Sequence, residues 1–198
     1  VVVVESLRAD QLLAYGADRD VMPAVNALAR QARVFRHAYT TSTFTHYAWP
    51  AILSSHYPLR SATDHIYPRK PEYPRVLLYD ILKGIGYRTA IFSSQNEYWG
   101  HMYNYLGTGS LDRFEHAATF DGPTLTFPED TGFASWVKQT RHAGSVDDRF
   151  TIAAALRWID TVRGGPFFVS LNLQSSHLPY YVGPGFRRRF SPEQLDFG

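Results

Sequence analysis

Hydrophobic residues occur in two patterns that alternate along this chain. Three short runs are rich in apolar residues: residues 1–4, where all four are valine, and residues 87–92 and 167–173. Three segments carry apolar residues at helical spacing: residues 23–32, 75–86 and 146–163. Continuous β-branched and aromatic runs are typical of strands that are buried on both faces of a parallel sheet. Alternation of such strands with helices predicts an α/β fold with a mainly parallel central sheet.

Capping signals locate the ends of these helices. Pro23 fits the first turn of the first helix, and Gly86 fits the stop of the second. Ser145 fits the N-cap of the third helix, and Gly164-Gly165 fits its end. Two stretches lack a helical pattern: residues 34–39, predicted as a strand or extended segment, and residues 112–144, predicted as irregular loops.

The stretch 43–58 is a hydroxyl-rich loop that leads into a short apolar helical pattern. Pro50 is tolerated only near the first turn of a helix, so the helix is predicted to begin near His46 or Tyr47. Thr45 then lies at the helix N-terminus, where backbone N–H groups and the helix dipole favour an anion. Two interpretations of Thr45 follow, a simple N-cap and a nucleophile.

Polar side chains follow each predicted strand. Glu5 ends the first strand, residues 93–100 follow the second, and His177 follows the third. The carboxyl ends of parallel strands meet at one edge of a sheet, where ligands of open α/β sheets bind. These residues are therefore candidates for one site.

Several motifs occur in a fixed order: Glu5, Tyr15-Gly16, Thr45, Tyr57-Pro58, residues 86–92 and residues 166–180. In this order and spacing they resemble the sulfatase-like branch of the alkaline phosphatase superfamily, over nearly the whole chain. The resemblance implies a three-layer α/β/α fold. It also implies that residues 1–198 form the N-terminal part of a single catalytic domain, so that the chain is a segment of a longer protein.

The resemblance also implies a set of site residues. Glu5 and Thr45 would bind a divalent metal ion, with Zn, Mn, Mg and Ca all open, and the remaining ligands would lie beyond residue 198. Thr45 would be the nucleophile that forms a covalent enzyme ester. His177 would act in catalysis and bind substrate oxygens, together with Asn96, and Trp99 would wall the pocket.

Some positions depart from the sulfatase pattern. Sulfatases carry two adjacent acids after the first strand and a modified Cys or Ser nucleophile followed by an Arg four residues later. Here Ser6 follows Glu5, and Trp49 stands four residues after Thr45. The sulfate-binding Lys and His of the pattern align with Ser94 and Asn96. These departures resemble the membrane-associated phosphoglycerol and phosphoethanolamine transferases, which use a Thr nucleophile.

The predicted function is therefore a metal-dependent hydrolase or transferase that acts on phosphate esters through Thr45. Two alternatives remain, a sulfuric ester hydrolase and a catalytically inactive sulfatase-like binding or regulatory module. A dinucleotide-binding domain is a weaker rival, because the first strand leads into Glu5-Ser-Leu-Arg8 without a Gly-x-Gly-x-x-Gly turn.

The composition of the chain limits which binding partners and metal sites can be expected. A net charge of +2 over 198 residues gives no reason to expect nucleic acid, and the absence of cysteine excludes disulfides and thiolate metal sites. No stretch approaches the roughly 18 to 20 apolar residues of a membrane-spanning helix. By resemblance, we expect a small-molecule, lipid or glycan ester as substrate, a location in the cell envelope or at the extracytoplasmic face of a membrane, and membrane association through segments outside this chain.

Overall fold

The structure is a computed structural model that describes residues 1–57, 67–71, 74–125 and 144–177. The chain divides into two compact units. The first unit contains Val1–Glu5 and Thr40–Ser175, and the second contains Ser6–Tyr39 and Ser176–Gly198. In the described ranges, no helix has the length and apolar character needed to cross a membrane.

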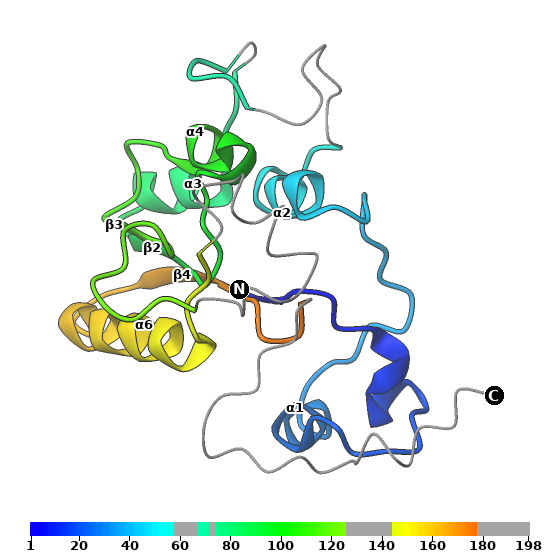
Figure 1. The fold of residues 1–198 in the computed structure, drawn as a ribbon. Helices are drawn as coiled ribbons and strands as arrows, with labels where there is room; N and C mark the ends of the chain where they lie inside the picture. Colours follow the sequence, from blue (N-terminus) through cyan, green and yellow to red (C-terminus); the bar gives the residue numbers. More distant parts are fainter. Residues whose placement is uncertain (58–66, 72–73, 126–143, 178–198) are drawn as a thin grey trace. The chain divides into compact units, whose positions relative to one another are not determined.

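The described residues of the first unit form a four-stranded parallel sheet with the order β1-β4-β2-β3 (Figure 1). Its strands have the bounds β1 Val2–Val4, β2 Arg88–Ser93, β3 Arg113–Glu115 and β4 Phe167–Leu173. The predicted parallel sheet is confirmed, and β4 has the predicted bounds. The short strand β3 was not expected, because it lies in the stretch 112–144 that has no clear pattern.

Strand β1 departs from the prediction of burial on both faces. It lies at the edge of the described sheet and pairs only with β4 there, and the side chains of Val1 and Val2 are 48% and 60% exposed. A continuous valine run is therefore typical of a strand in a parallel sheet, but it does not distinguish an edge strand from a central one.

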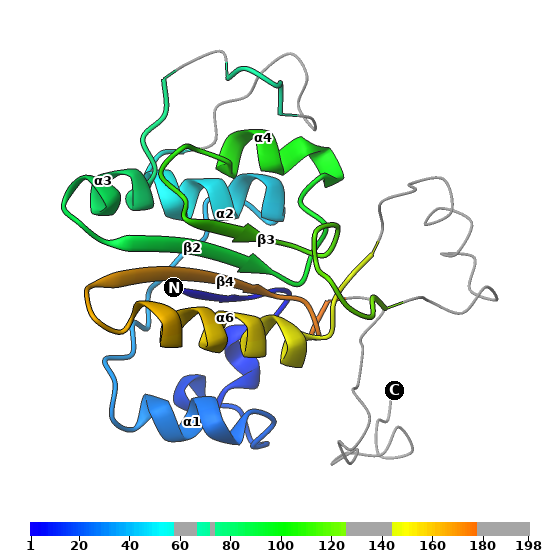
Figure 2. The same ribbon diagram turned by 90° about the vertical axis from the view of Figure 1, so that its left-hand side faces the viewer.

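Helices cover both faces of the sheet (Figure 2). On one face lie α2 (Thr45–Ser54), α3 (Leu78–Gly84) and α4 (Met102–Leu106), with the 3₁₀ turn η3 (Trp99–His101) before α4. On the other face, α6 (Asp148–Val162) packs along β2 and β4. The predicted three-layer α/β/α arrangement is therefore confirmed.

Strand β2 shows how the two hydrophobic cores form. Successive side chains of a strand point to opposite faces, so Ile91 enters one core while Ala90 and Phe92 enter the other. Ile91 packs with buried residues of the three-helix layer: Trp49, Leu53, Leu77, Tyr79, Met102, Tyr105 and Leu106. Ala90 and Phe92 pack against Ala154 and Ala155 of α6. Burial of both faces fixes the register of the sheet.

Helix α2 begins at Thr45, one or two residues earlier than predicted, so Pro50 lies inside the helix. Proline has no N–H group, and the carbonyl of His46 therefore receives no helical hydrogen bond from position 50. The hydroxyl of Tyr67 instead donates a hydrogen bond to that carbonyl. This contact supplies the hydrogen-bond donor that proline lacks. The helix can therefore begin at Thr45, earlier than the position of Pro50 predicted.

Helix α6 is capped differently from the prediction. Its N-cap is Asp147, whose carboxylate accepts a hydrogen bond of 2.9 Å from the backbone N–H of Arg149. Ser145 instead forms backbone bridges with Gln95 and Leu125. An aspartate side chain satisfies the free N–H groups of the first turn as well as a serine does, so sequence alone could not separate the two positions.

The second unit has short helices held by polar contacts. It contains the 3₁₀ turns η1 (Ala9–Gln11) and η2 (Leu13–Tyr15) and the helix α1 (Pro23–Ala29), which begins at the predicted proline. Asn26 is buried, accepts a hydrogen bond from the N–H of Leu13 and donates one to Asp20. Residues 34–39 form no strand.

A pH-dependent contribution to stability is expected from Asp112. Partial burial opposes its ionisation, but hydrogen bonds from Lys83, the N–H of Thr89 and Arg88 outweigh burial and lower the pKa of its carboxyl from 3.8 to about 2. A lowered folded-state pKa gives stability that is present above pH 3.8 and is lost as the pH falls toward 2. Replacement of Asp112 by Asn should therefore reduce the free energy of unfolding at pH 7 by about 1 to 2 kcal/mol.

Denaturant unfolding at a series of pH values measures this effect, with the exposed Asp121→Asn as a control that leaves the Asp112 contacts in place. The difference between wild type and Asp112→Asn should shrink between pH 4 and pH 2. A difference that stays constant over this range would contradict the prediction.

Candidate active site

Glu5 and Thr45 are brought together at the carboxyl edge of the sheet, as predicted. The hydroxyl of Thr45 donates a hydrogen bond of 2.8 Å to Oε2 of Glu5, across 40 residues of sequence. Thr45 is the first residue of α2, and Phe44 precedes it as N-cap without a side-chain hydrogen bond. Thr45 is therefore not the N-cap, and its hydroxyl points to a carboxylate instead of to the helix backbone.

The backbone holds Glu5 in place at the end of β1. Its N–H donates a hydrogen bond of 3.0 Å to the carbonyl of Leu173 at the end of β4. The next residue, Ser6, has a φ of 57°, a left-handed conformation that is uncommon for residues other than glycine. The chain thus turns sharply directly after Glu5. Because this next residue is a serine, it adds no second carboxylate to the site.

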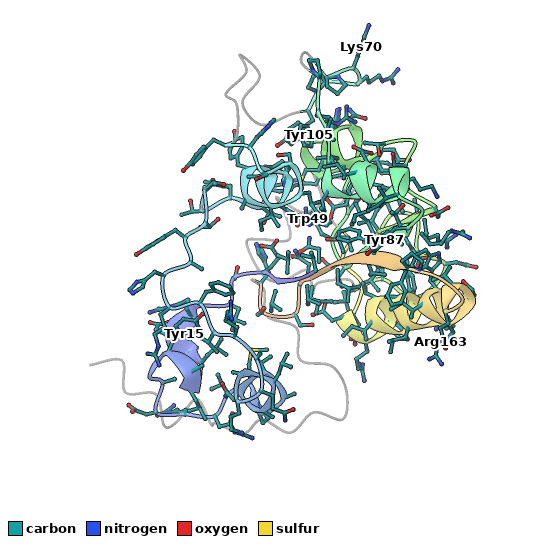
Figure 3. The ribbon with its side chains drawn as sticks, turned by 180° about the vertical axis from the view of Figure 1, so that it is seen from behind. Tyr15, Trp49, Lys70, Tyr87, Tyr105 and Arg163 are labelled. Atoms are coloured by element: carbon teal, nitrogen blue, oxygen red, sulfur yellow. The ribbon has the colours of Figure 1, made fainter. Side chains whose placement is uncertain are left out.

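Trp49 anchors the helix that carries Thr45. Its indole is 1% exposed and lies in the core on the side of α2 that faces the sheet (Figure 3). The indole N–H donates a long hydrogen bond of 3.4 Å to the hydroxyl of Ser170 on β4. The position at which sulfatases have an arginine is therefore used here for packing, and its side chain cannot bind a substrate anion.

Ser94, at the position of the family's lysine, is also committed to the structure. It is fully buried, and its hydroxyl bonds to Asp148 at 2.6 Å and to Thr151 at 2.8 Å. Asp148 also accepts hydrogen bonds from the backbone N–H groups of Gln174 and Ser175. Ser94 and Asp148 thus tie the start of α6 to the ends of β2 and β4.

His46, next to Thr45, is enclosed by the segment that follows β2. Its ring is 5% exposed and lies 3.8 Å from the ring of Trp99, centroid to centroid. Gly100 has a φ of 57°, and a Cβ atom added to it would lie 1.7 Å from Nε2 of His46. Only a glycine allows the backbone to approach this ring so closely.

The other predicted site residues have different placements. Asn96 is buried, and its side-chain oxygen accepts a hydrogen bond of 3.0 Å from the N–H of Tyr98. Trp99 is 36% exposed and packs on His46, and its role as a pocket wall stays a prediction. His177 belongs to the second unit, so its role in catalysis and substrate binding stays a prediction.

Glu97 is a further buried acid at this edge of the sheet, and it was not predicted as a site residue. It is fully buried, and its Oε1 accepts a hydrogen bond of 2.5 Å from the hydroxyl of Ser93. Burial outweighs the opposing hydrogen bonds of Ser93 and Asn172 and, together with the nearby charge of Glu5, raises the pKa of its carboxyl to about 8. Glu97 is therefore mostly protonated at pH 7.

Two buried oxygen atoms lack a hydrogen-bond donor among the described residues. One is Oε2 of Glu97 itself, and the other is Oδ1 of the fully buried Asn172. A protonated carboxyl can both accept and donate, so it is less costly in this setting than a carboxylate would be. The only sequence signal for Glu97 was its place in the polar stretch 93–100 after β2.

The carboxylate oxygens of Glu5 and the hydroxyl oxygen of Thr45 are suitable ligands for part of a site for a hard divalent cation. Such cations prefer carboxylate and hydroxyl oxygens, and Ca²⁺ takes about six to eight of them. Within the described ranges, however, no group of three or more His, Asp or Glu side chains is arranged to hold a metal ion. A metal ion bound by Glu5 and Thr45 would therefore need further ligands from elsewhere in the protein.

Substitution of Gly100 tests the packing around His46. Gly100→Ala places a Cβ atom on the His46 ring and forces a left-handed conformation on alanine. The free energy of unfolding should fall by about 2 kcal/mol or more. The ring-current shift that Trp99 imposes on the NMR signals of His46 should change as well.

Gly84→Ala is the matched control, because a Cβ atom at this last residue of α3 meets nothing within 4 Å. It should leave stability equal to or slightly above that of wild type. Equal stabilities of the two variants would show that the close approach of Gly100 to His46 is not required.

Known proteins support this description of the fold. A protein in the alkaline phosphatase superfamily from Vibrio parahaemolyticus has a crystal structure similar to this one, with a TM-score of 0.72 and 19% sequence identity. The match covers 98% of this chain and 44% of that protein, so this chain spans less than half the length of its structural neighbour. At this identity the likeness shows the fold alone.

Comparisons at the level of sequence give the family. No curated protein matches the chain. The Sulfatase family matches it over residues 1–196, which is almost its whole length. The chain therefore belongs to the Sulfatase family, as the order and spacing of its motifs predicted.

Proposed function

We propose that the protein containing this chain is a metal-dependent hydrolase or transferase that acts on phosphate or sulfate esters, with Thr45 as its nucleophile. The observation that carries this proposal is the hydrogen bond of 2.8 Å from the Thr45 hydroxyl to Glu5 at the first residue of α2. Membership of the Sulfatase family supports the same class of reaction.

The placement of Thr45 suits nucleophilic attack. Glu5 accepts the hydroxyl proton in a hydrogen bond, and this orients an oxygen lone pair of Thr45 away from the carboxylate. The helix N-terminus stabilises negative charge that develops on the oxygen or on an ester group beside it. A divalent cation, when bound, would lower the pKa of the hydroxyl and neutralise charge on the substrate.

The reaction then runs in two steps. The Thr45 hydroxyl loses its proton to solvent, and its oxygen forms a bond to phosphorus as the bond from phosphorus to the leaving alkoxide breaks; the alkoxide takes up a proton from solvent. Water or an acceptor alcohol next loses a proton and attacks the phosphorus, the bond from phosphorus to the Thr45 oxygen breaks, and this oxygen takes up a proton to restore the hydroxyl. We propose that His177 and Asn96 donate hydrogen bonds to the non-bridging oxygens and that Trp99 walls the pocket.

Two buried positions favour phosphate over sulfate as the reacting group. Trp49 and Ser94 occupy the positions at which sulfatases have a cationic Arg and Lys, and both side chains are committed to packing or to hydrogen bonds inside the fold. An unmodified threonine also lacks the aldehyde hydrate through which sulfatases release sulfate. A phosphate ester on Thr45, in contrast, can be cleaved by attack of water or an alcohol at phosphorus.

Sulfuric ester hydrolysis remains the alternative activity, because the matching family carries the name Sulfatase. A catalytically inactive binding or regulatory module would keep the fold without turnover. Kinetic measurements on the complete protein separate these three functions.

Thr45→Ala should abolish turnover of the complete protein, with a loss of at least about a thousandfold in kcat. It should leave the fold intact and cost only about 1 kcal/mol in unfolding free energy, the value of one hydrogen bond. Glu5→Ala should lose both metal and activity. Steady-state kinetics, thermal unfolding and metal analysis provide the three readouts.

Thr43→Ala is the matched control, because Thr43 is an exposed hydroxyl two residues away and should retain activity. Substantial turnover by Thr45→Ala, or loss in Thr43→Ala alone, would move the nucleophile to another residue. Turnover absent from wild type under all conditions would favour the inactive module.

Matched aryl phosphomonoester, phosphodiester and sulfate substrates test the reacting group. With a range of divalent metals, kcat/KM for one of the phosphoesters should exceed that for the sulfate by at least tenfold, which corresponds to about 1.4 kcal/mol of transition-state free energy. A sulfate preferred by the same factor would establish the sulfatase instead.

A further inference from the structure

A small cavity lies beside the segment that encloses His46. It has a volume of about 230 Å³ and is lined by Arg69, Tyr98, His101, Tyr103 and Asn104. Sites for drug-sized ligands occupy about 300 to 1,000 Å³, so this cavity suits one functional group and part of a ring or short chain. A single ordered water, with about 30 Å³, would leave most of it empty.

Aromatic contacts fix two walls of the cavity. Tyr103 stacks on Phe114 with ring centroids 5.0 Å apart, and Tyr98 meets Tyr103 edge-on at 5.5 Å. Tyr98 also packs edge-on against His116 at 4.7 Å. Both tyrosines remain partly exposed, at 42% and 39%, so ring surface stays open for a ligand to contact.

Hydrogen bonds through Tyr67 hold the loop that carries Arg69. The N–H of Tyr67 donates to the carbonyl of Gly100 at 2.9 Å, and its carbonyl accepts from the side chain of Asn104 at 3.0 Å. Its hydroxyl donates to the carbonyl of His46. Tyr67, two residues before Arg69, is therefore hydrogen-bonded to η3, to α4 and to the start of α2.

Arg69 brings a positive charge to the cavity. The described residues that line it include this guanidinium and the imidazole of His101, and none of these described lining residues is an acid. In the part of the chain that the structure describes, neither Arg69 nor His101 forms an ion pair. A planar guanidinium beside ring nitrogen, amide and phenol donors is a suitable environment for a carboxylate, phosphate or sulfate.

The cavity is connected to the candidate active site by a short piece of chain. Tyr98 and His101 line the cavity, and between them Trp99 and Gly100 pack on His46, the neighbour of Thr45. Only the contacts of Trp99 and Gly100 with His46 thus separate the cavity lining from the start of α2, which carries Thr45.

We propose that this cavity binds a second, non-reacting anionic group on the alcohol portion of the ester substrate, held by Arg69 and His101 against the exposed surfaces of Tyr98 and Tyr103. The proposal rests on the proposed function for its link to the reaction, but anion binding by the cavity can be measured without turnover. The substrate class is then an ester whose alcohol portion itself carries a carboxylate, phosphate or sulfate.

The first test measures binding of benzenesulfonate, a stable ring-bearing anion, to the complete protein by NMR. The imidazole signals of His101 should shift in a saturable manner. The uncharged benzenesulfonamide should bind at least about tenfold more weakly, because it lacks the ion pair with Arg69. Arg69→Gln should weaken benzenesulfonate binding by a similar factor.

Lys70→Gln is the control, because it removes an equal charge from the next residue, which does not line the cavity and whose side chain extends away from Tyr105 of α4 (Figure 3). It should leave the affinity for benzenesulfonate unchanged. His101 signals that do not respond, or equal affinities of the Arg69→Gln and Lys70→Gln variants, would overturn the proposal.

The second test compares aryl phosphates with and without a carboxylate on the aryl group. The carboxylate should lower KM in wild type, and Arg69→Gln should remove this advantage with kcat nearly unchanged, since the contact is made equally in the ground and transition states. A carboxylate that gives no KM advantage in wild type would overturn the link to the substrate. Benzenesulfonate binding as expected, with no turnover of any ester, would contradict the proposed function and leave the anion site standing.

Discussion

The position of the candidate nucleophile depends on how α2 is docked to the sheet. Trp49 fills the core beneath the helix, packs with residues of α3 and α4 and donates its indole N–H to Ser170 on β4. A buried aromatic ring contributes more to stability than any polar contact at this edge, on the order of 3 to 5 kcal/mol when removed. The hydrogen bond between Thr45 and Glu5 is therefore the result of this packing and adds little to it.

The carboxyl edge of the sheet contains more buried polar groups than packing alone requires. Ser93, Ser94, Asn96, Glu97 and Asn172 are all buried there. Ser94 has a clear structural role through Asp148, whereas Glu97 and Asn172 retain acceptors without donors among the described residues. Buried polar groups cost stability unless they are paired, and such costs are concentrated at functional sites.

The sequence predicted the parts of the fold that follow from strong local patterns. Strand β4, the proline start of α1 and the meeting of Glu5 with Thr45 all followed from hydrophobic runs and from the geometry of parallel sheets. The exposed position of β1 could not be predicted, because strand order depends on long-range pairing. The environment of His46 was also missed, since the close approach of Gly100 is a tertiary contact with no local signature.

Pro50 has a consequence for how this family member varies. A proline inside α2 makes the helix dependent on a donor from elsewhere in the chain, and the Tyr67 hydroxyl is that donor. Positions 50 and 67 therefore form a pair in which each residue limits what the other can become. In relatives whose residue at position 50 has an N–H group, the hydroxyl at position 67 is no longer needed for the helix.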